Sequence, residues 1–97
     1  MSHSSGLVLF SRRGCCLCEG LEEKLRALEP ALPLEIRDVD AQPALQARYG
    51  LSVPVLAMRE AGSVAESWRE LPRVPPRLAG EGLRIWLLRN GFPPESA

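Results

Sequence analysis

The sequence lacks an excess of charge of either sign, because its 12 basic and 12 acidic residues give a formal net charge of zero. Proteins that bind nucleic acids or anionic membrane surfaces through electrostatic attraction carry a basic excess. The sequence also lacks any apolar run near the roughly 18–20 residues that a membrane-spanning helix needs. We therefore expect neither a nucleic acid nor a membrane as a partner.

The sequence is also poor in histidine and has no widely spaced cysteines. His3 is the only histidine, and the three cysteines lie together at positions 15, 16 and 18. A structural zinc site needs four ligands, which this chain does not offer by itself. Secreted disulfide frameworks usually have an even number of cysteines spread along the chain. A reducing compartment fits this pattern better, so we expect a cytoplasmic protein.

Hydrophobic patterning predicts one α/β domain. A chain of this length is expected to form a single domain over residues 1–97, with flexible tails at residues 1–5 and 92–97. The predicted element order is β-α-β-α-β-β-α. The initial strand–helix–strand unit requires a parallel strand pair with a right-handed crossover, and the two later strands form an antiparallel hairpin. The predicted fold is therefore a four-stranded mixed sheet with helices on both faces.

Individual elements are predicted from apolar spacing and from residues that start or end helices. Consecutive apolar residues in the first strand indicate burial on both faces, and Pro30 is expected to end the first helix. Asp40 is the predicted N-cap of the second helix, and Gly50 is expected in the left-handed conformation that often follows a helix. The proline-rich segment 71–77 is interpreted as a rigid spacer, with partner binding as the alternative. The predicted strands cover residues 6–11, 34–39, 53–58 and 63–68, and the predicted first and last helices cover residues 15–29 and 79–90.

The segment Gly14-Cys15-Cys16-Leu17-Cys18 places a Cys-x-x-Cys pair where the first strand turns into the first helix. Unpaired N–H groups and the helix dipole stabilise a thiolate at a helix N-terminus, and the thiolate is the form that attacks a disulfide. Cys15 is therefore the predicted nucleophile. Cys18, almost one helical turn later, is predicted to resolve the mixed disulfide. Arg12 and Arg13 are predicted to lie on the substrate side of the site and to add positive potential there.

Other roles for the cysteines remain open. Cys16 is interpreted as a spectator, or as a residue that captures a second thiol. Cys15, Cys16 and Cys18 could instead serve a metal or iron–sulfur carrier, with a site shared between two chains. Inert, buried cysteines are the alternative that involves no chemistry.

Three parts of the chain together resemble the short bacterial glutaredoxin-like proteins of the thioredoxin superfamily, and the resemblance spans about residues 7–88. These parts are the cysteine segment at residues 14–18, the strand end Asp38-Val39-Asp40, and residues 49–56. The resemblance implies a thioredoxin-like fold and a thiol–disulfide oxidoreductase that reduces disulfides or mixed disulfides. A protein-interaction module that keeps this fold without the chemistry is the alternative.

The resemblance also implies roles for residues outside the cysteine segment. It implies a cis-proline at Pro54 beside the redox pair, and a Val53 backbone that pairs with the substrate chain. Glutathione-using glutaredoxins usually carry Pro-Tyr between the two cysteines, where this chain has Cys16-Leu17. They also carry Gly-Gly followed closely by Asp before the last helix, where this chain has Gly80-Glu81-Gly82.

The expected partners follow from this resemblance and from its two departures. The expected substrate is a disulfide-containing protein or a glutathione mixed disulfide. The electron donor is either glutathione, as a co-substrate, or a thioredoxin-type reductase. We expect no bound cofactor, no metal ion and a monomeric protein.

Overall fold

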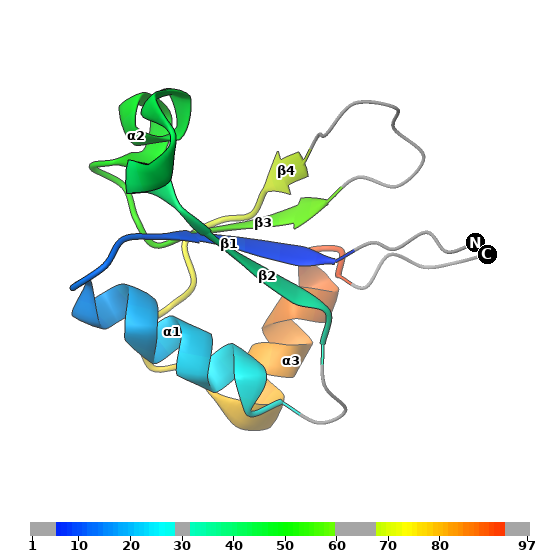
Figure 1. Ribbon diagram of the computed structural model, residues 1–97. Helices are drawn as coiled ribbons and strands as arrows, with labels where there is room; N and C mark the ends of the chain where they lie inside the picture. Colours follow the sequence, from blue (N-terminus) through cyan, green and yellow to red (C-terminus); the bar gives the residue numbers. More distant parts are fainter. Residues whose placement is uncertain (1–5, 29–31, 60–67, 93–97) are drawn as a thin grey trace.

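The computed structural model describes residues 6–28, 32–59 and 68–92, and all the helices and strands named in the text lie within these ranges (Figure 1). Their order is β1 (Leu7–Ser11), α1 (Cys16–Arg26), β2 (Leu34–Asp38), the 3-10 helix η1 (Val39–Ala41), α2 (Pro43–Tyr49), β3 (Val55–Arg59), β4 (Trp68–Glu70) and α3 (Gly80–Arg89). This order confirms the predicted β-α-β-α-β-β-α pattern, with η1 as an addition between β2 and α2.

The strands form one four-stranded mixed sheet in the order β2-β1-β3-β4. β1 runs parallel to β2 and antiparallel to β3, and β3 runs antiparallel to β4. Leu9 of β1 stands opposite Ile36 of β2 and Leu56 of β3, so β1 is a central strand. A strand that is covered on both faces explains the consecutive apolar residues of β1. The predicted mixed sheet is confirmed.

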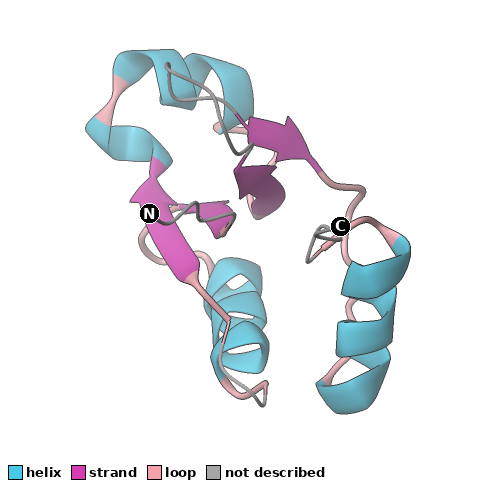
Figure 2. Cartoon of the chain, turned by 90° about the vertical axis from the view of Figure 1, so that its right-hand side faces the viewer, coloured by secondary structure: helices cyan, strands magenta, loops and turns pink. Residues whose placement is uncertain are grey.

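Helices cover both faces of the sheet, as predicted. α1 and α3 lie on one face and α2 lies on the other, and the two views agree on this arrangement (Figure 1, Figure 2). Successive side chains of a strand point to opposite faces. Leu9 therefore packs with residues of α1 and α3, whereas Phe10 stacks on Tyr49 of α2 with 4.5 Å between ring centroids. β1 thus contributes to the core on both sides of the sheet.

The ends of α1 and β4 differ most from the predicted ones. α1 ends at Arg26, before the predicted end at residue 29, because the chain tightens there: the Leu28 N–H donates to the Leu25 carbonyl three residues back. β4 is described from Trp68, the last residue of the predicted strand 63–68, and continues through two polar residues; residues 63–67 of that prediction lie outside the described residues. It is an edge strand, as expected, and polar side chains are common on such edges. Residues 60–67, which hold the predicted hairpin turn, lie outside the described residues.

The chain after α3 turns back into the core at the residue where the predicted C-terminal tail begins. Gly91 has a φ of 99°, in the left-handed region that favours glycine. This turn buries Phe92 to 2% exposure, and the Phe92 N–H donates to the Leu87 carbonyl at 2.8 Å. Residue 92 therefore belongs to the folded domain, which corrects the predicted tail boundary. The other predicted tail residues, 1–5 and 93–97, lie outside the described residues.

Phe92→Ala should lower the free energy of unfolding by about 3–5 kcal/mol, because truncation of a buried Phe loses apolar burial and leaves a cavity. Urea unfolding followed by circular dichroism measures the loss. Leu88→Ala is the matched control, since Leu88 lies on α3 and is 55% exposed, and it should cost less than about 1 kcal/mol. A loss for Phe92→Ala no larger than the loss for Leu88→Ala would contradict the packing of Phe92.

Candidate functional site

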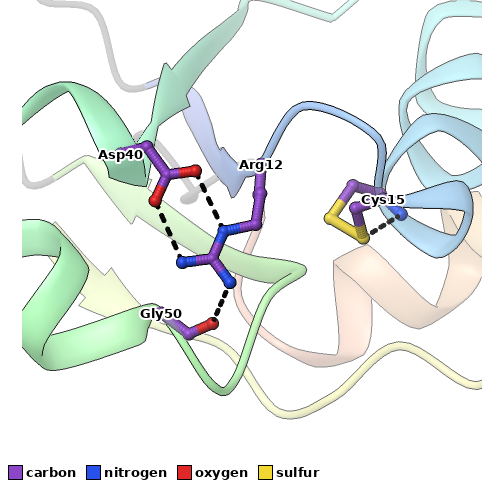
Figure 3. Close-up of a disulfide and its surroundings, with 5 residues drawn as sticks. Arg12, Cys15, Asp40 and Gly50 are labelled. Atoms are coloured by element: carbon purple, nitrogen blue, oxygen red, sulfur yellow. Dashed lines mark hydrogen bonds and ion pairs between the residues drawn. A yellow bond between two sulfur atoms is a disulfide. The ribbon is translucent and has the colours of Figure 1, made fainter.

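A disulfide joins Cys15 and Cys18 at the point where the chain passes from β1 into α1, with 5.2 Å between the two Cα atoms (Figure 3). Gly14, with a φ of 81°, makes the turn that precedes the helix. Cys15 is the N-cap of α1, and its Sγ accepts a hydrogen bond from the Cys18 N–H at 3.1 Å. The structure therefore brings the two predicted redox cysteines together at the N-terminus of the helix.

The two sulfurs of the pair have different surroundings. Cys18 is buried to 1% exposure, whereas Cys15 is only half-buried. In the reduced protein, the Cys18 N–H and the other unpaired N–H groups of the first turn favour the thiolate at Cys15. A dissolved disulfide can reach Cys15 but not the buried Cys18. The geometry thus distinguishes one accessible sulfur at the helix N-terminus from one protected sulfur.

Cys16 is free, exposed and outside the disulfide. It occupies the first position inside α1, so its side chain does not take the capping position that Cys15 holds. Across residues 6–28, 32–59 and 68–92, no group of three or more His, Cys, Asp or Glu side chains is placed to hold a metal ion. In this oxidised form, two of the three sulfurs of the alternative metal or cluster site are bonded to each other.

Arg12 points away from the disulfide and is held by two other segments (Figure 3). Its Nε and Nη2 donate to the two carboxylate oxygens of Asp40 at 3.0 Å each, and its Nη1 donates to the Gly50 carbonyl at 3.0 Å. The guanidinium therefore links the end of β1 to η1 and to the end of α2. Its charge is balanced by Asp40 rather than directed at the cysteines. Arg13, the other predicted cation, is exposed at the turn.

The partners of Arg12 correct the prediction for the start of the second helix. Asp40 is not the N-cap of α2; Gln42 stands at that position and makes no capping bond through its side chain. Both Asp40 oxygens instead accept hydrogen bonds from the Arg12 guanidinium, in a bidentate, charge-assisted pair that fixes the orientation of both side chains. Asp38 caps η1 through the Asp40 N–H at 2.9 Å.

The expected left-handed conformation of Gly50 is wrong, since its φ of −56° and ψ of −30° are right-handed. Glycine is required there by a close approach: a Cβ would stand 2.5 Å from the Gln46 carbonyl oxygen and 3.3 Å from Arg12 Nη2. Sequence reasoning identifies neither partner of Arg12 as a site residue. They lie 28 and 38 residues along the chain, and no local signal connects them to Arg12.

Val53 and Pro54 lie in the segment between α2 and β3. The Val53–Pro54 peptide bond is cis, and the Val53 N–H donates to the Tyr49 carbonyl at 3.1 Å. Pro54 lines a groove together with Cys16 and Leu17, so this segment and the start of α1 share one surface.

We call this cavity the α1–loop groove. Its walls are α1 and the proline-rich segment 70–76, its floor is the start of β3, and its volume is about 270 Å³. The Lys24 ammonium on α1 donates to the Pro76 carbonyl and joins the two walls. The lining of the groove includes Leu17, Lys24, Pro54, Arg73 and Val74, of which only Pro54 is a predicted site residue.

Comparison with known proteins gives a matching family and similar solved structures. The family model described as Glutaredoxin-like domain (DUF836) matches residues 6–88, which include the cysteine segment and Pro54. The X-ray structure of Northeast Structural Genomics target protein XcR50 from X. campestris is similar, with 32% sequence identity and a TM-score of 0.52. The match covers 86% of this chain and 96% of that chain. None of the curated proteins compared with this chain matches it significantly. Among the described helices, none is long and apolar enough to cross a membrane.

Asp40→Asn should remove a pH-dependent contribution to stability. Hydrogen bonds from Arg12, and next from Gln46, hold the pKa of the Asp40 carboxyl below its ordinary value of 3.8. Asp40 therefore stabilises the folded state above about pH 4 and loses this contribution as the pH falls through the lowered pKa. The wild type should be more stable than the variant at about pH 6, and urea unfolding should show the difference shrinking below about pH 4.

The double variant with Arg12→Gln provides the control, because the partner that lowers the pKa is then absent. Adding Asp40→Asn to Arg12→Gln should change the pH dependence of stability far less than Asp40→Asn alone. A wild-type advantage that stays constant from about pH 6 to about pH 3 would show that the Arg12–Asp40 pair does not act in this way.

Proposed function

The chain belongs to the family of glutaredoxin-like domains, and we propose that it is a thiol–disulfide oxidoreductase that reduces disulfides or mixed disulfides. The observation that carries this proposal is the N-cap position of Cys15, whose sulfur accepts the Cys18 N–H at 3.1 Å while Cys18 itself is buried. This arrangement supplies one accessible sulfur that is favoured as a thiolate and one protected sulfur within bonding distance of it.

The reaction starts from the reduced pair. The Cys15 thiolate attacks one sulfur of the substrate disulfide; a Cys15–substrate bond forms, and the other substrate sulfur leaves as a thiolate that takes a proton from water. The Cys18 thiolate then attacks the Cys15 sulfur, the mixed disulfide breaks, and the second substrate thiol is released. Two electrons pass from the protein to the substrate, which leaves the Cys15–Cys18 disulfide.

Val53 and Pro54 are proposed to guide the substrate chain, because Pro54 borders the groove next to the cysteine segment. The Val53 N–H is already bonded to Tyr49, so its carbonyl is the group left to pair with a substrate N–H. Exposed Arg13 is proposed as a contact for an anionic substrate. For Arg12, the bonds to Asp40 and Gly50 favour a structural role, in which Arg12 holds η1 and the end of α2 beside the end of β1, rather than a role in binding substrate.

The cycle needs an electron donor, because each turnover leaves the pair oxidised. Either two molecules of glutathione or a thioredoxin-type reductase supplies the two electrons, and no bound cofactor is needed for exchange between sulfurs. Such a donor is maintained in a reducing compartment, so a cytoplasmic location is part of the proposal. We also propose that the protein acts as a monomer, since both sulfurs of the reaction come from one chain.

Replacement of either redox cysteine should stop turnover, with different products. All variants carry Cys16→Ser, which leaves only the two thiols in question and makes any adduct unambiguous. With insulin or a glutathione mixed disulfide as substrate, Cys15→Ser should reduce the rate to that of the uncatalysed reaction. With insulin as substrate, Cys18→Ser should also lose turnover, because the resolving thiol is absent, and should accumulate a substrate adduct on Cys15 that mass spectrometry detects.

The protein with Cys16→Ser alone is the reference for both variants. Turnover by Cys15→Ser equal to that of the reference would rule out Cys15 as the nucleophile. If no variant and no parent protein reduces either substrate, and the purified protein contains stoichiometric zinc or an iron–sulfur chromophore, the carrier interpretation replaces the proposal.

A further inference from the structure

The last helix, α3, has an exposed outer face, and we propose that this face pairs with the same face of a second copy of the chain. Leu83 and Leu87 of α3 are buried in the core, whereas Ile85 is 43% exposed and Leu88 is 55% exposed. The proposed contact is an antiparallel pair of α3 helices related by a two-fold axis. Each chain keeps a complete redox pair, so the single chain remains the unit that acts on a disulfide.

The exposed apolar side chains of α3 lie apart from the redox site. Ile85 and Leu88 are three residues apart, and residues at this spacing are neighbours on a helix surface. In Figure 2, α3 lies at the edge of the layer that it forms with α1, next to the end marked C. The lining of the α1–loop groove includes no residue of α3. A partner on this face would therefore leave the cysteine pair open to substrate.

Three exposed residues of α3 form a ridge along this face. Glu81, Ile85 and Arg89 are spaced four apart, and residues four apart lie on the same side of a helix. Glu81 lies in the first turn and Arg89 in the last. Arg84, the remaining charged residue of α3, is partly buried. The ridge thus has a negative charge at one end, an apolar side chain in the middle and a positive charge at the other end.

This order of charges is complementary to its own reverse. A two-fold axis at Ile85 places Ile85 of the two copies together and makes the two helices antiparallel. Glu81 and Arg89 lie four residues on either side of Ile85, so Glu81 of each copy faces Arg89 of the other. A parallel pair would instead bring like charges together, so the charges also select the direction. Packing between ridges of residues four apart is the commonest contact between two helices.

Gly82 leaves room for the second exposed apolar side chain. Leu88 and Gly82 lie three residues on either side of Ile85, so Leu88 of one copy faces Gly82 of the other. A Cβ added at Gly82 would meet only the Leu78 side chain within 4 Å, at 3.4 Å. Burial of Ile85 and Leu88 on both copies supplies the attraction. The ion pairs at the rim mainly fix the orientation.

The small size of the contact determines its strength. α3 has 10 residues and is about 15 Å long. One pair of such helices buries less than the roughly 1,200–2,000 Å² of a standard interface between proteins. We therefore expect an equilibrium between single chains and pairs at about 0.1–1 mM, rather than a permanent dimer.

Sedimentation equilibrium of the oxidised, full-length protein tests the pairing, with Cys16→Ser in every variant to exclude disulfides between chains. The average mass should rise above the 10.7 kDa of one chain as the concentration increases from about 0.05 to about 1 mM. Glu81→Arg and Arg89→Glu should each weaken the association about tenfold, because both ion pairs then become pairs of like charge. Glu23→Arg makes the same change as the first variant on the exposed side of α1 and should associate as the parent does.

A mixture of the two charge-reversed chains gives the decisive result. Positions 81 and 89 are both basic in one variant and both acidic in the other, so a mixed pair again has two opposite-charge contacts. The equimolar mixture should therefore recover the association that each variant alone has lost. Glu81 and Arg89 also favour α3 itself through the helix dipole, but mixing two chains would not recover a loss of helix stability.

Two results would overturn the pairing of α3. The first is an average mass that stays at 10.7 kDa up to about 1 mM. The second is association that is equal in the parent, the two variants and their mixture, because another surface would then carry it. Neither result bears on the proposed oxidoreductase, since the mass is measured without a substrate.

Discussion

The bidentate ion pair between Arg12 and Asp40 joins the turn before the Cys15–Cys18 disulfide to the segment that follows β2. Arg12 follows β1 and precedes the cysteine turn, while its third bond reaches Gly50, at the start of the chain that carries Val53 and Pro54. Three segments far apart in sequence therefore share one guanidinium. Gly50 makes the contact possible, because any side chain at that position would approach Arg12 and the preceding turn of helix too closely. The guanidinium thus holds the turn before the cysteine segment beside the chain that leads to Pro54.

The stability of the fold and the geometry of the site come from different kinds of contact. β1 is buried on both faces by two apolar clusters, and burial of this kind supplies most of the free energy of folding. The Arg12–Asp40 pair is about one-third exposed on each side chain, and exposed ion pairs add little to stability because water and salt screen them. The pair instead fixes geometry, because a planar guanidinium with several donors sets the relative orientation of the groups that accept its hydrogen bonds.

The fold can be predicted from local sequence signals, and the site only in part. The consecutive apolar residues of β1 identify a central strand, and the Cys-x-x-Cys spacing after a strand identifies the N-terminus of α1, because both signals are carried by neighbouring residues. The predicted role of Asp40 is wrong because the local sequence, an Asp three residues before Pro43, is typical of the start of a helix and hides a different role. Its actual partner lies 28 residues away, and a contact of that separation leaves no periodicity in the sequence. The same limit applies to the burial of Phe92 and to the groove, which brings Leu17 and Lys24 against Arg73 and Val74.

The three sulfurs differ in their position relative to the helix as well as in their exposure. Cys16 is more exposed than Cys15, and exposure alone would make it the sulfur that meets a substrate first. Cys15, however, holds the N-cap, where its sulfur receives the Cys18 N–H, whereas a side chain one residue later points away from the free N–H groups. Stabilisation of the thiolate is thus directed at one of two neighbouring thiols. Cys18 differs from both, because it is buried. A sulfur that solvent cannot reach can exchange only with a neighbouring sulfur, and the first turn of the helix places Cys15 beside it.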